Sequence, residues 1–275
     1  MIELPEAISL AKQINDTLVG QTITGVFNSN SPHKFTFFYE DPLKYPQLLT
    51  GRKINLATGC KMFVDINLDS GTTISISEGV NLKYGNIKSQ IPAKYQFLLT
   101  FDNDAFLVFT VAMYGGIAAY KDNFDNKYHK LSAESVSPLS DAFDDVYFNS
   151  LIDSQKQNLS LKAFLATEQR IPGVGNGVIQ DILFNASLNP RKKLCDLNGQ
   201  QKQNLFNSLK STLTAMTKEG GRDTETDLFG NKGGYKSVLS KNTYKNPCPR
   251  CGSKIIKEGY LGGTVYYCLD CQPPN

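Results

Sequence analysis

Two CxxC pairs lie in the last part of the sequence, at Cys248, Cys251, Cys268 and Cys271. Each pair presents two sulfur atoms from one tight turn, and sixteen residues separate the pairs. Such pairs supply the four thiolates of one tetrahedral zinc ion, and a closed four-sulfur site leaves no position for a reacting water. A reducing compartment disfavours the alternative, disulfides. We therefore expect one structural zinc ion, with Cys60 and Cys195 as buried, unliganded thiols.

A second candidate is the short turn at residues 171–176, with the sequence IPGVGN, which lies between two stretches of helical periodicity. Its glycines, Gly173 and Gly175, allow backbone amides to come close to a phosphate group. Taken alone, this segment is equally a turn that joins two helices. Only its surroundings give it a functional meaning.

The first part of the chain is predicted to open with a helix and to continue as strands. From Pro5 to Val19 apolar residues recur at helical spacing, with proline in the first turn and Gly20 just beyond the end. From Thr22 to about Phe109, short runs rich in Ile, Val, Phe and Thr alternate with turn sequences. This pattern is typical of a β-sandwich or a barrel.

The chain has 275 residues, of which 40% are hydrophobic, and this size favours two domains over one. We expect a β-sandwich domain with an opening helix at 1–134, a Ser/Asp-rich linker at 135–150, a helical domain at 151–240 and a metal-binding tail at 241–275. The helical domain rests on periodicity from Leu159 to Phe184 and from Gly199 to Thr217. The predicted fold class is therefore α+β.

Charge is unevenly distributed along the sequence. The first 150 residues carry 12 basic and 16 acidic side chains, a net charge of −4, and the rest carries 17 basic and 10 acidic, a net charge of +7. A basic second half indicates that a polyanion is held mainly by the C-terminal part, although an ordinary solvated surface has the same composition.

The sequence has no apolar run that approaches the roughly 18 to 20 residues needed to cross a bilayer. Its first residues include Glu3 where a signal peptide would be basic. We therefore expect a cytoplasmic protein.

Several motifs follow one another in a recognisable order. The opening stretch ELPE at residues 3–6 leads into the first helix, and a second stretch, GCK at 59–61, contains Lys61. Three further stretches precede the cysteines: LKAFLATEQRIPGVGN at 161–176, DILF at 181–184 and NP at 189–190. Over essentially the whole chain, this order resembles the formamidopyrimidine-DNA glycosylase and endonuclease VIII family, with its helix-two-turn-helix domain and zinc finger.

The resemblance implies a two-domain clamp on a kinked DNA duplex, with the damaged nucleotide flipped out of the stack. It implies that Lys61 and Asn176, together with the preceding Gly175, contact phosphates beside the lesion. In the family, the amine of an N-terminal proline attacks the sugar to form a Schiff base, and the adjacent glutamate is the general acid/base. Here Glu3 takes the position of that glutamate and Ile2 takes the position of the proline.

Ile2 is the main departure from the family pattern. A residue as bulky as isoleucine should block removal of Met1, which leaves the amine one residue too far from Glu3. A displacement of about 1 Å can cost about a hundredfold in rate, so we expect weak strand cleavage at abasic sites. The alternative interpretation of Ile2 is an apolar plug in the floor of the cleft.

Two DNA-contacting stretches also differ. The family's Asp-Pro-Arg-Arg-Phe stretch, which enters the gap left by the flipped base, corresponds to VAMYG at 111–115. Met113 or Tyr114 could wedge between bases there, or could merely pack. The arginine of the family's finger corresponds to a position near Gly263, where Lys254 is a nearby substitute for the missing charge or an ordinary solvated lysine.

Three functions remain. The first is a monomeric DNA glycosylase that acts on damaged bases or abasic sites in double-stranded DNA, with zinc in its finger and Glu3 as acid/base. The second is a damaged-DNA-binding protein that has lost catalysis, and the third is a zinc-ribbon interaction protein unrelated to repair. The matches at Glu3, Lys61 and Asn176 favour them in that order, because a pure binder has no chemical need for a carboxylate at that position.

Overall fold

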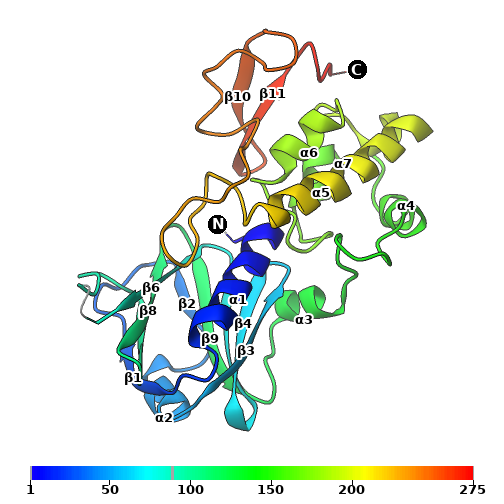
Figure 1. Ribbon diagram of the computed structural model, residues 1–275. Helices are drawn as coiled ribbons and strands as arrows, with labels where there is room; N and C mark the ends of the chain where they lie inside the picture. Colours follow the sequence, from blue (N-terminus) through cyan, green and yellow to red (C-terminus); the bar gives the residue numbers. More distant parts are fainter. Residues whose placement is uncertain (1, 88–89, 275) are drawn as a thin grey trace. The chain divides into compact units, whose positions relative to one another are not determined.

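A computed structural model describes residues 2–87 and 90–274 and divides into two compact units (Figure 1). The first unit joins Met1–Ala133 to Glu225–Gly233, and the second joins Glu134–Thr224 to Gly234–Asn275. These units differ from the expected segments in two respects. Residues 225–233 belong to the first unit, and the stretch 135–150, expected as a linker, is part of the second.

The first unit contains helices α1 (Leu4–Leu18), α2 (Tyr45–Leu49) and α3 (Lys127–Glu134, ending at the unit boundary) and strands β1 (Ile23–Asn28), β2 (Thr36–Phe38), β3 (Ile54–Cys60), β4 (Phe63–Leu68), β5 (Thr72–Ser77), β6 (Val80–Asn86), β7 (Phe97–Phe101), β8 (Ala105–Val111) and β9 (Gly115–Lys121). The strands form two sheets, in the orders β1-β7-β8-β6 and β2-β9-β5-β4-β3. Neighbouring strands are antiparallel, apart from the parallel pair β2 and β9.

The core of this unit draws on both sheets and on α1. Leu99 and Leu107 from the first sheet and Ile74 and Ile117 from the second belong to one buried cluster, as does Ile14 from α1. Alternate strand residues face opposite sides of a sheet, so the intervening side chains point away from this core. The predicted sandwich with an opening helix is confirmed.

The first helix is one residue offset from the predicted range. Its N-terminus is a capping box, in which Glu3 is the N-cap, the Glu6 carboxylate accepts a hydrogen bond from the Glu3 backbone N–H at 3.2 Å, and Pro5 lies in the first turn. Pairing of this kind satisfies backbone donors that a helix start leaves open. The helix therefore begins at a fixed residue.

Strand β9 is not predicted by the sequence, because the run of strand-forming residues ends near Phe109. It begins with two glycines and contains two alanines, which are weak strand formers. The strand forms because it pairs with both β2 and β5. Pairing on both sides here outweighs local propensity.

The segment 225–233 is held on the first unit by polar and apolar contacts. The Gln13 side chain accepts a hydrogen bond from Leu228 N at 3.0 Å and donates one to Asp227 Oδ2 at 2.9 Å. Leu228 itself is fully buried in the core, and its carbonyl accepts from Tyr84 N at 2.8 Å. These are long-range contacts that no local pattern reveals.

The second unit contains helices α4 (Asp145–Asp153), α5 (Leu161–Ala166), α6 (Ile179–Asn185) and α7 (Gly199–Lys218) and the hairpin strands β10 (Ile255–Tyr260) and β11 (Gly263–Cys268). Helix α6 packs on α7, where Ser208 Oγ donates to Ile182 O at 2.6 Å and Asn185 Nδ2 donates to Thr212 Oγ1 at 3.0 Å. The helical domain with a cysteine-bearing hairpin is confirmed. Among the described residues, no helix is both long and apolar enough to cross a membrane.

Candidate functional site

Ile2 and Glu3, the first two site residues, are both buried. Ile2 is 3% exposed and packs in the hydrophobic core of the first unit. Glu3 is 2% exposed at the N-cap of α1. The predicted retention of Met1 lies outside the described residues. At position 2, the side chain is an apolar core residue.

The close approach of α1 to β3 sets where Glu3, at the start of α1, lies relative to Lys61, the next candidate residue. A Cβ on Gly59 would stand 2.8 Å from the carbonyl oxygen of Ala7 and from the amide nitrogen of Ile8, which is closer than real Cβ atoms come. Only glycine permits this approach. Two residues later Lys61 begins the β3–β4 turn, between the paired residues Cys60 and Phe63.

Lys61 has a left-handed backbone conformation, with φ of 58°. This conformation is uncommon for a residue with a side chain and is often found at functional sites. Its side chain is 8% exposed, and the ammonium donates a hydrogen bond to the Ser132 carbonyl. Burial lowers the pKa of Lys61 and raises the pKa of the neighbouring Cys60 thiol. In this arrangement the ammonium has a protein partner.

Two loops at one end of the sandwich lie in contact. A Cβ on Gly79, whose φ is +85°, would stand 1.6 Å from the Tyr114 carbonyl oxygen, so glycine is required there. The Tyr114 hydroxyl donates to Glu78 Oε1 at 3.1 Å. Burial raises the pKa of Tyr114 to about 12, and the negative charges of Glu78 and, more weakly, Glu3 act in the same direction. Tyr114 therefore lies near both carboxylates, while Met113 is 62% exposed.

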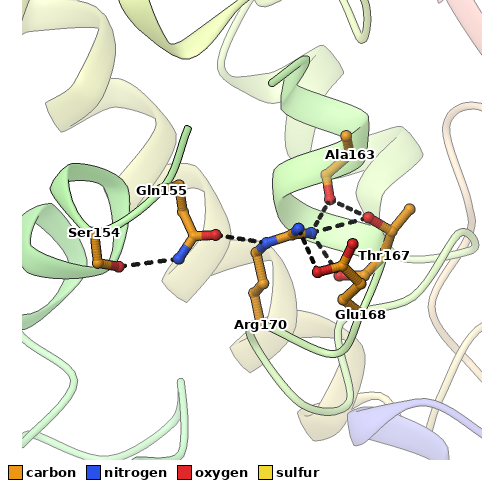
Figure 2. A network of polar contacts seen from close by, with 6 residues as sticks. All are labelled: Ser154, Gln155, Ala163, Thr167, Glu168 and Arg170. Carbon is orange, nitrogen blue, oxygen red and sulfur yellow. Dashed lines mark hydrogen bonds and ion pairs between the residues drawn. The ribbon is translucent and has the colours of Figure 1, made fainter. Parts of the chain in front are cut away.

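In the second unit, Arg170 holds the turn that the sequence analysis singled out. Figure 2 shows its guanidinium between two helices: Nε donates to Gln155 Oε1 at 2.7 Å, and Nη1 donates to the carbonyls of Ala163 and Thr167 at 2.9 and 3.0 Å. It also pairs with Glu168 at 2.7 Å. The Ala163 carbonyl also accepts from Thr167 N at 3.3 Å, so Arg170 adds a second bond there and a bond to the Thr167 carbonyl at the C-terminal end of α5. They fix the start of the turn at residues 171–176.

The turn ends against the tip of the cysteine hairpin. Asn176 Nδ2 donates to the Thr264 carbonyl at 2.9 Å, whereas its Oδ1 is buried and has no partner among the described residues. A Cβ on Gly263 would come within 3.0 Å of that Oδ1. Gly175 is buried, and its carbonyl accepts from Ile179 N at 3.3 Å. The hairpin and the turn are thus one packed element.

The sulfurs of Cys248, Cys251, Cys268 and Cys271 all lie within 4.8 Å of one another. The sulfur–sulfur distance is 3.8 Å between Cys248 and Cys271 and 3.4 Å between Cys251 and Cys268, far longer than a disulfide bond. With zinc–sulfur bonds of about 2.3 Å, tetrahedral geometry separates sulfurs by about 3.8 Å. The donor set and its spacing fit a four-coordinate metal ion.

One expectation about the other cysteines is wrong. Cys60 is partly buried, but Cys195 is exposed, in a short 3-10 turn at Leu194–Asp196. Its neighbour Leu194 takes the buried position of that turn. Lys254 is exposed, at the start of the hairpin.

Sequence reasoning missed Glu78 and the pair formed by His129 and Asp65. His129 Nε2 lies 2.8 Å from Asp65 Oδ2, on the outer side of the five-stranded sheet. Asp65 gave no sequence signal of a functional role, because a polar residue that faces outward from a strand such as β4 is ordinary. Glu78 had a weak one, since the Glu-Gly dipeptide directly after a strand is typical of a constrained loop.

Comparison with known proteins supports a single family. Formamidopyrimidine-DNA glycosylase of Prochlorococcus marinus strain NATL2A is 32% identical over 168 residues, which cover 54% of this chain and 58% of that protein. The match thus spans somewhat more than half the length of this relative. The enzyme of the same name from Ruthia magnifica is 25% identical over 99% of this chain and 100% of its own length. No protein-family profile matches the chain.

Solved structures share the fold over nearly the whole chain. The MutM (Fpg) protein of Thermus thermophilus has a TM-score of 0.81 at 22% identity and covers 99% of each chain. A complex between Lactococcus lactis Fpg and DNA with an abasic site has a TM-score of 0.82 at 19% identity, over 98% of this chain and 99% of that one.

Fold and site together define a protein with a β-sandwich unit and a helical unit that ends in a four-cysteine hairpin. Over its full length the chain is similar to formamidopyrimidine-DNA glycosylases, and it shares the fold of solved MutM (Fpg) structures.

Proposed function

We propose that this protein is a base-excision repair DNA glycosylase that acts on damaged bases or abasic sites in double-stranded DNA. The observation that carries the proposal is the Glu3 carboxylate, 2% exposed at the start of α1, in a chain of this family. Burying a carboxylate is costly, and a buried acid is well suited to proton transfer. Glu3 would activate water or protonate the opening sugar, a contribution of typically about a hundred- to ten-thousandfold.

A proline-type Schiff base is not part of this proposal, since Ile2 packs in the hydrophobic core. We expect strand cleavage at abasic sites to be weak. The substrate would be held by phosphate contacts from Asn176, Gly175 and Lys254 in the second unit and from Lys61 in the first. Lys61 would have to exchange the Ser132 carbonyl for a phosphate oxygen.

The metal of the four-cysteine site would be a single zinc ion with a structural role, because four thiolates close its coordination sphere. Chromosomal DNA as the substrate and bacterial relatives favour an action at the nucleoid, in the cytoplasm. The protein would act as a monomer.

The proposal is tested by base release from duplexes with oxidised or ring-opened bases. Glu3→Gln should abolish release, because glutamine keeps the hydrogen-bonding shape but cannot transfer a proton. Glu6→Gln is the matched control, since Glu6 shares the capping box and is also buried, at 5% exposure. It should retain most activity. Full base release by Glu3→Gln would refute the assigned role.

A second function is favoured by one observation, the engagement of the Lys61 ammonium with a protein carbonyl. A protein with Ile2 in its core and Lys61 occupied could bind lesions without chemistry. In that case, neither the natural chain nor Ile2→Pro would release a base or be trapped on abasic DNA by borohydride, yet both would bind it tightly. A gain of trapping in Ile2→Pro would instead support the enzyme.

A further inference from the structure

The hairpin formed by β10 and β11 has two edges, and side chains of the same unit cover the edge of β11 (Figure 1). The Thr264 carbonyl accepts from Asn176 Nδ2 at 2.9 Å and from Gln180 Nε2 at 3.2 Å. Tyr266 N donates to Gln180 Oε1 at 2.9 Å. The turn before α6 and α6 itself therefore occupy backbone groups that an edge strand otherwise leaves open.

The outer edge of β10, by contrast, is open at Lys257 and Gly259. These residues pair with Tyr266 and Thr264, respectively, and opposite residues of an antiparallel pair exchange both backbone hydrogen bonds or neither. Because Thr264 and Tyr266 bond toward α6, Lys257 and Gly259 direct their N–H and C=O groups away from the hairpin on its other side. Both residues are exposed, and in the described part of the chain no residue bonds to these outward groups. A Cβ on Gly259 would meet nothing within 4 Å.

The chain itself pairs with this edge at the start of the strand. Pro247 forms an antiparallel bridge with Lys254, and Cys248 N donates to Ser253 O at 2.7 Å. A hollow of about 730 Å³ lies between residues 244–247 and residues 254–257. When a peptide adds a strand to a sheet edge, its backbone gives affinity and pockets beside the edge take alternate side chains. The hollow supplies such a pocket next to the open part of β10.

The surroundings of this edge are basic. Residues 234–257 contain six basic side chains and no acidic one, and four thiolates around one divalent zinc ion offset only part of this charge. The Lys257 ammonium lies 4.7 Å from the centre of the Tyr244 ring, and the next acidic residue, Glu258, pairs with Arg191 at 2.8 Å. Three exposed lysines line the hollow: Lys245, Lys254 and Lys257. A partner for this edge is therefore negatively charged.

We propose that the edge of β10 binds an extended acidic segment of a partner protein, which adds a strand to the hairpin. The backbone of this segment exchanges hydrogen bonds with Lys257 and Gly259, and its carboxylates pair with Lys245 and Lys257. The outward carbonyls of the edge need donors at the spacing of a β-strand, which peptide N–H groups supply and phosphates do not. A second copy of the chain is disfavoured, because pairing would bring two basic edges together. This interaction does not depend on the proposed function.

The probe is a fluorescent synthetic peptide in which glutamate and valine alternate, titrated into the full-length protein and followed by fluorescence anisotropy. A matched peptide carries methyl groups on its backbone nitrogens, which removes the donors and keeps the charge. The unmodified peptide should bind more tightly by about tenfold or more, since several backbone hydrogen bonds are lost together. Equal binding of the two peptides would overturn strand addition.

The edge itself is tested at Gly259. Gly259→Pro should weaken binding of the unmodified peptide about fivefold or more, because proline removes an outward N–H and keeps the bonds between the two strands. Gly259→Ala is the matched control and should bind normally, since a Cβ there meets nothing within 4 Å. Equal melting temperatures and metal contents in the two variants show that the hairpin is intact. Equal peptide binding by both would contradict the proposal.

The charge is tested separately by reversing two lysines. Lys245→Glu combined with Lys257→Glu should weaken peptide binding by about tenfold or more. Lys156→Glu combined with Lys193→Glu is the control, at exposed positions of the same unit, and should have little effect. Lys254 stays unchanged, because it is a candidate phosphate contact.

A single-stranded oligothymidylate is the second probe. Peptide binding that Gly259→Pro and the Lys245/Lys257 reversal weaken, and that their controls preserve, supports the proposal. An oligothymidylate that binds through Lys245 and Lys257, with no binding of the peptide, would assign the surface to nucleic acid and overturn it. Base release is measured in parallel, so that loss of the glycosylase activity and loss of peptide binding are seen independently.

Discussion

Gly59 of β3 and Ala7 of α1 are in backbone contact: a Cβ on Gly59 would stand 2.8 Å from the Ala7 carbonyl oxygen. Gly59→Ala must therefore push α1 away from the β3–β4 hairpin, and with it Glu3 away from Lys61. We expect a loss of about 1 to 3 kcal/mol in unfolding free energy, as for other overpacked sites, and a larger fractional loss of base release. Gly259→Ala is the control, because a Cβ at that position would have nothing within 4 Å. Equal activity in both variants would show that this contact does not position Glu3.

Arg170 is expected to be irreplaceable by lysine. The planar guanidinium reaches Gln155, Ala163 and Thr167 at once, and an ammonium cannot. Arg170→Lys should destabilise the second unit by about 2 to 3 kcal/mol and weaken DNA binding, measured by denaturant unfolding and fluorescence anisotropy. Glu168→Ala, which removes only a largely exposed partner, should change either quantity little.

Metal analysis should return one zinc ion per chain. Cys251→Ser or a strong chelator should unfold the hairpin and weaken DNA binding, because metal binding supplies folding free energy to such small elements. Cys195→Ser is the matched control, since Cys195 is exposed and distant in sequence from the cluster. Purified protein with full DNA affinity and no metal would contradict the zinc assignment.

Salt dependence should separate two kinds of phosphate contact. DNA affinity is expected to fall steeply with salt, and Lys61→Ala should make the slope shallower by about one unit. Asn176→Ala should weaken binding with almost no change of slope, because its amide is uncharged. Both variants need affinities over a range of salt concentrations. Unchanged binding in both would mean that neither residue faces the DNA.

Asp181 should make the stability of the second unit depend on pH. It is 1% exposed and accepts from Val238 N and Leu239 N at 2.8 Å each, and burial raises its pKa to about 6. The folded state binds the proton of the Asp181 carboxyl more tightly than the unfolded state does. The contribution of Asp181 to the unfolding free energy is therefore fully present below about pH 4 and is lost as the pH rises to about 6. The loss is of the order of 3 kcal/mol.

The measurement compares unfolding free energies of the natural chain and Asp181→Asn from about pH 3.5 to 7. The unfolding free energy of the natural chain minus that of Asp181→Asn should decrease between about pH 4 and 6 and stay constant above that range. Asp16→Asn, at an exposed carboxylate, is the control. A difference that is flat across the range would contradict the raised pKa.

Features that depend on neighbouring residues were predictable from the sequence. The two CxxC pairs predicted the metal-binding cluster, because each pair folds within one turn. Helix α1 was placed to within one residue and α7 likewise, since helical spacing and capping residues are local signals. The order of motifs predicted the family and the two-part fold.

Other features were decided by tertiary structure. Strand β9 has weak local propensity and exists through its pairing with β2 and β5, and this pairing places Gly116 between Phe37 and Ser77. The engagement of Lys61 with Ser132 joins residues 71 positions apart. Periodicity reveals which face of an element is buried, but only the packed chain sets which distant residues meet on that face.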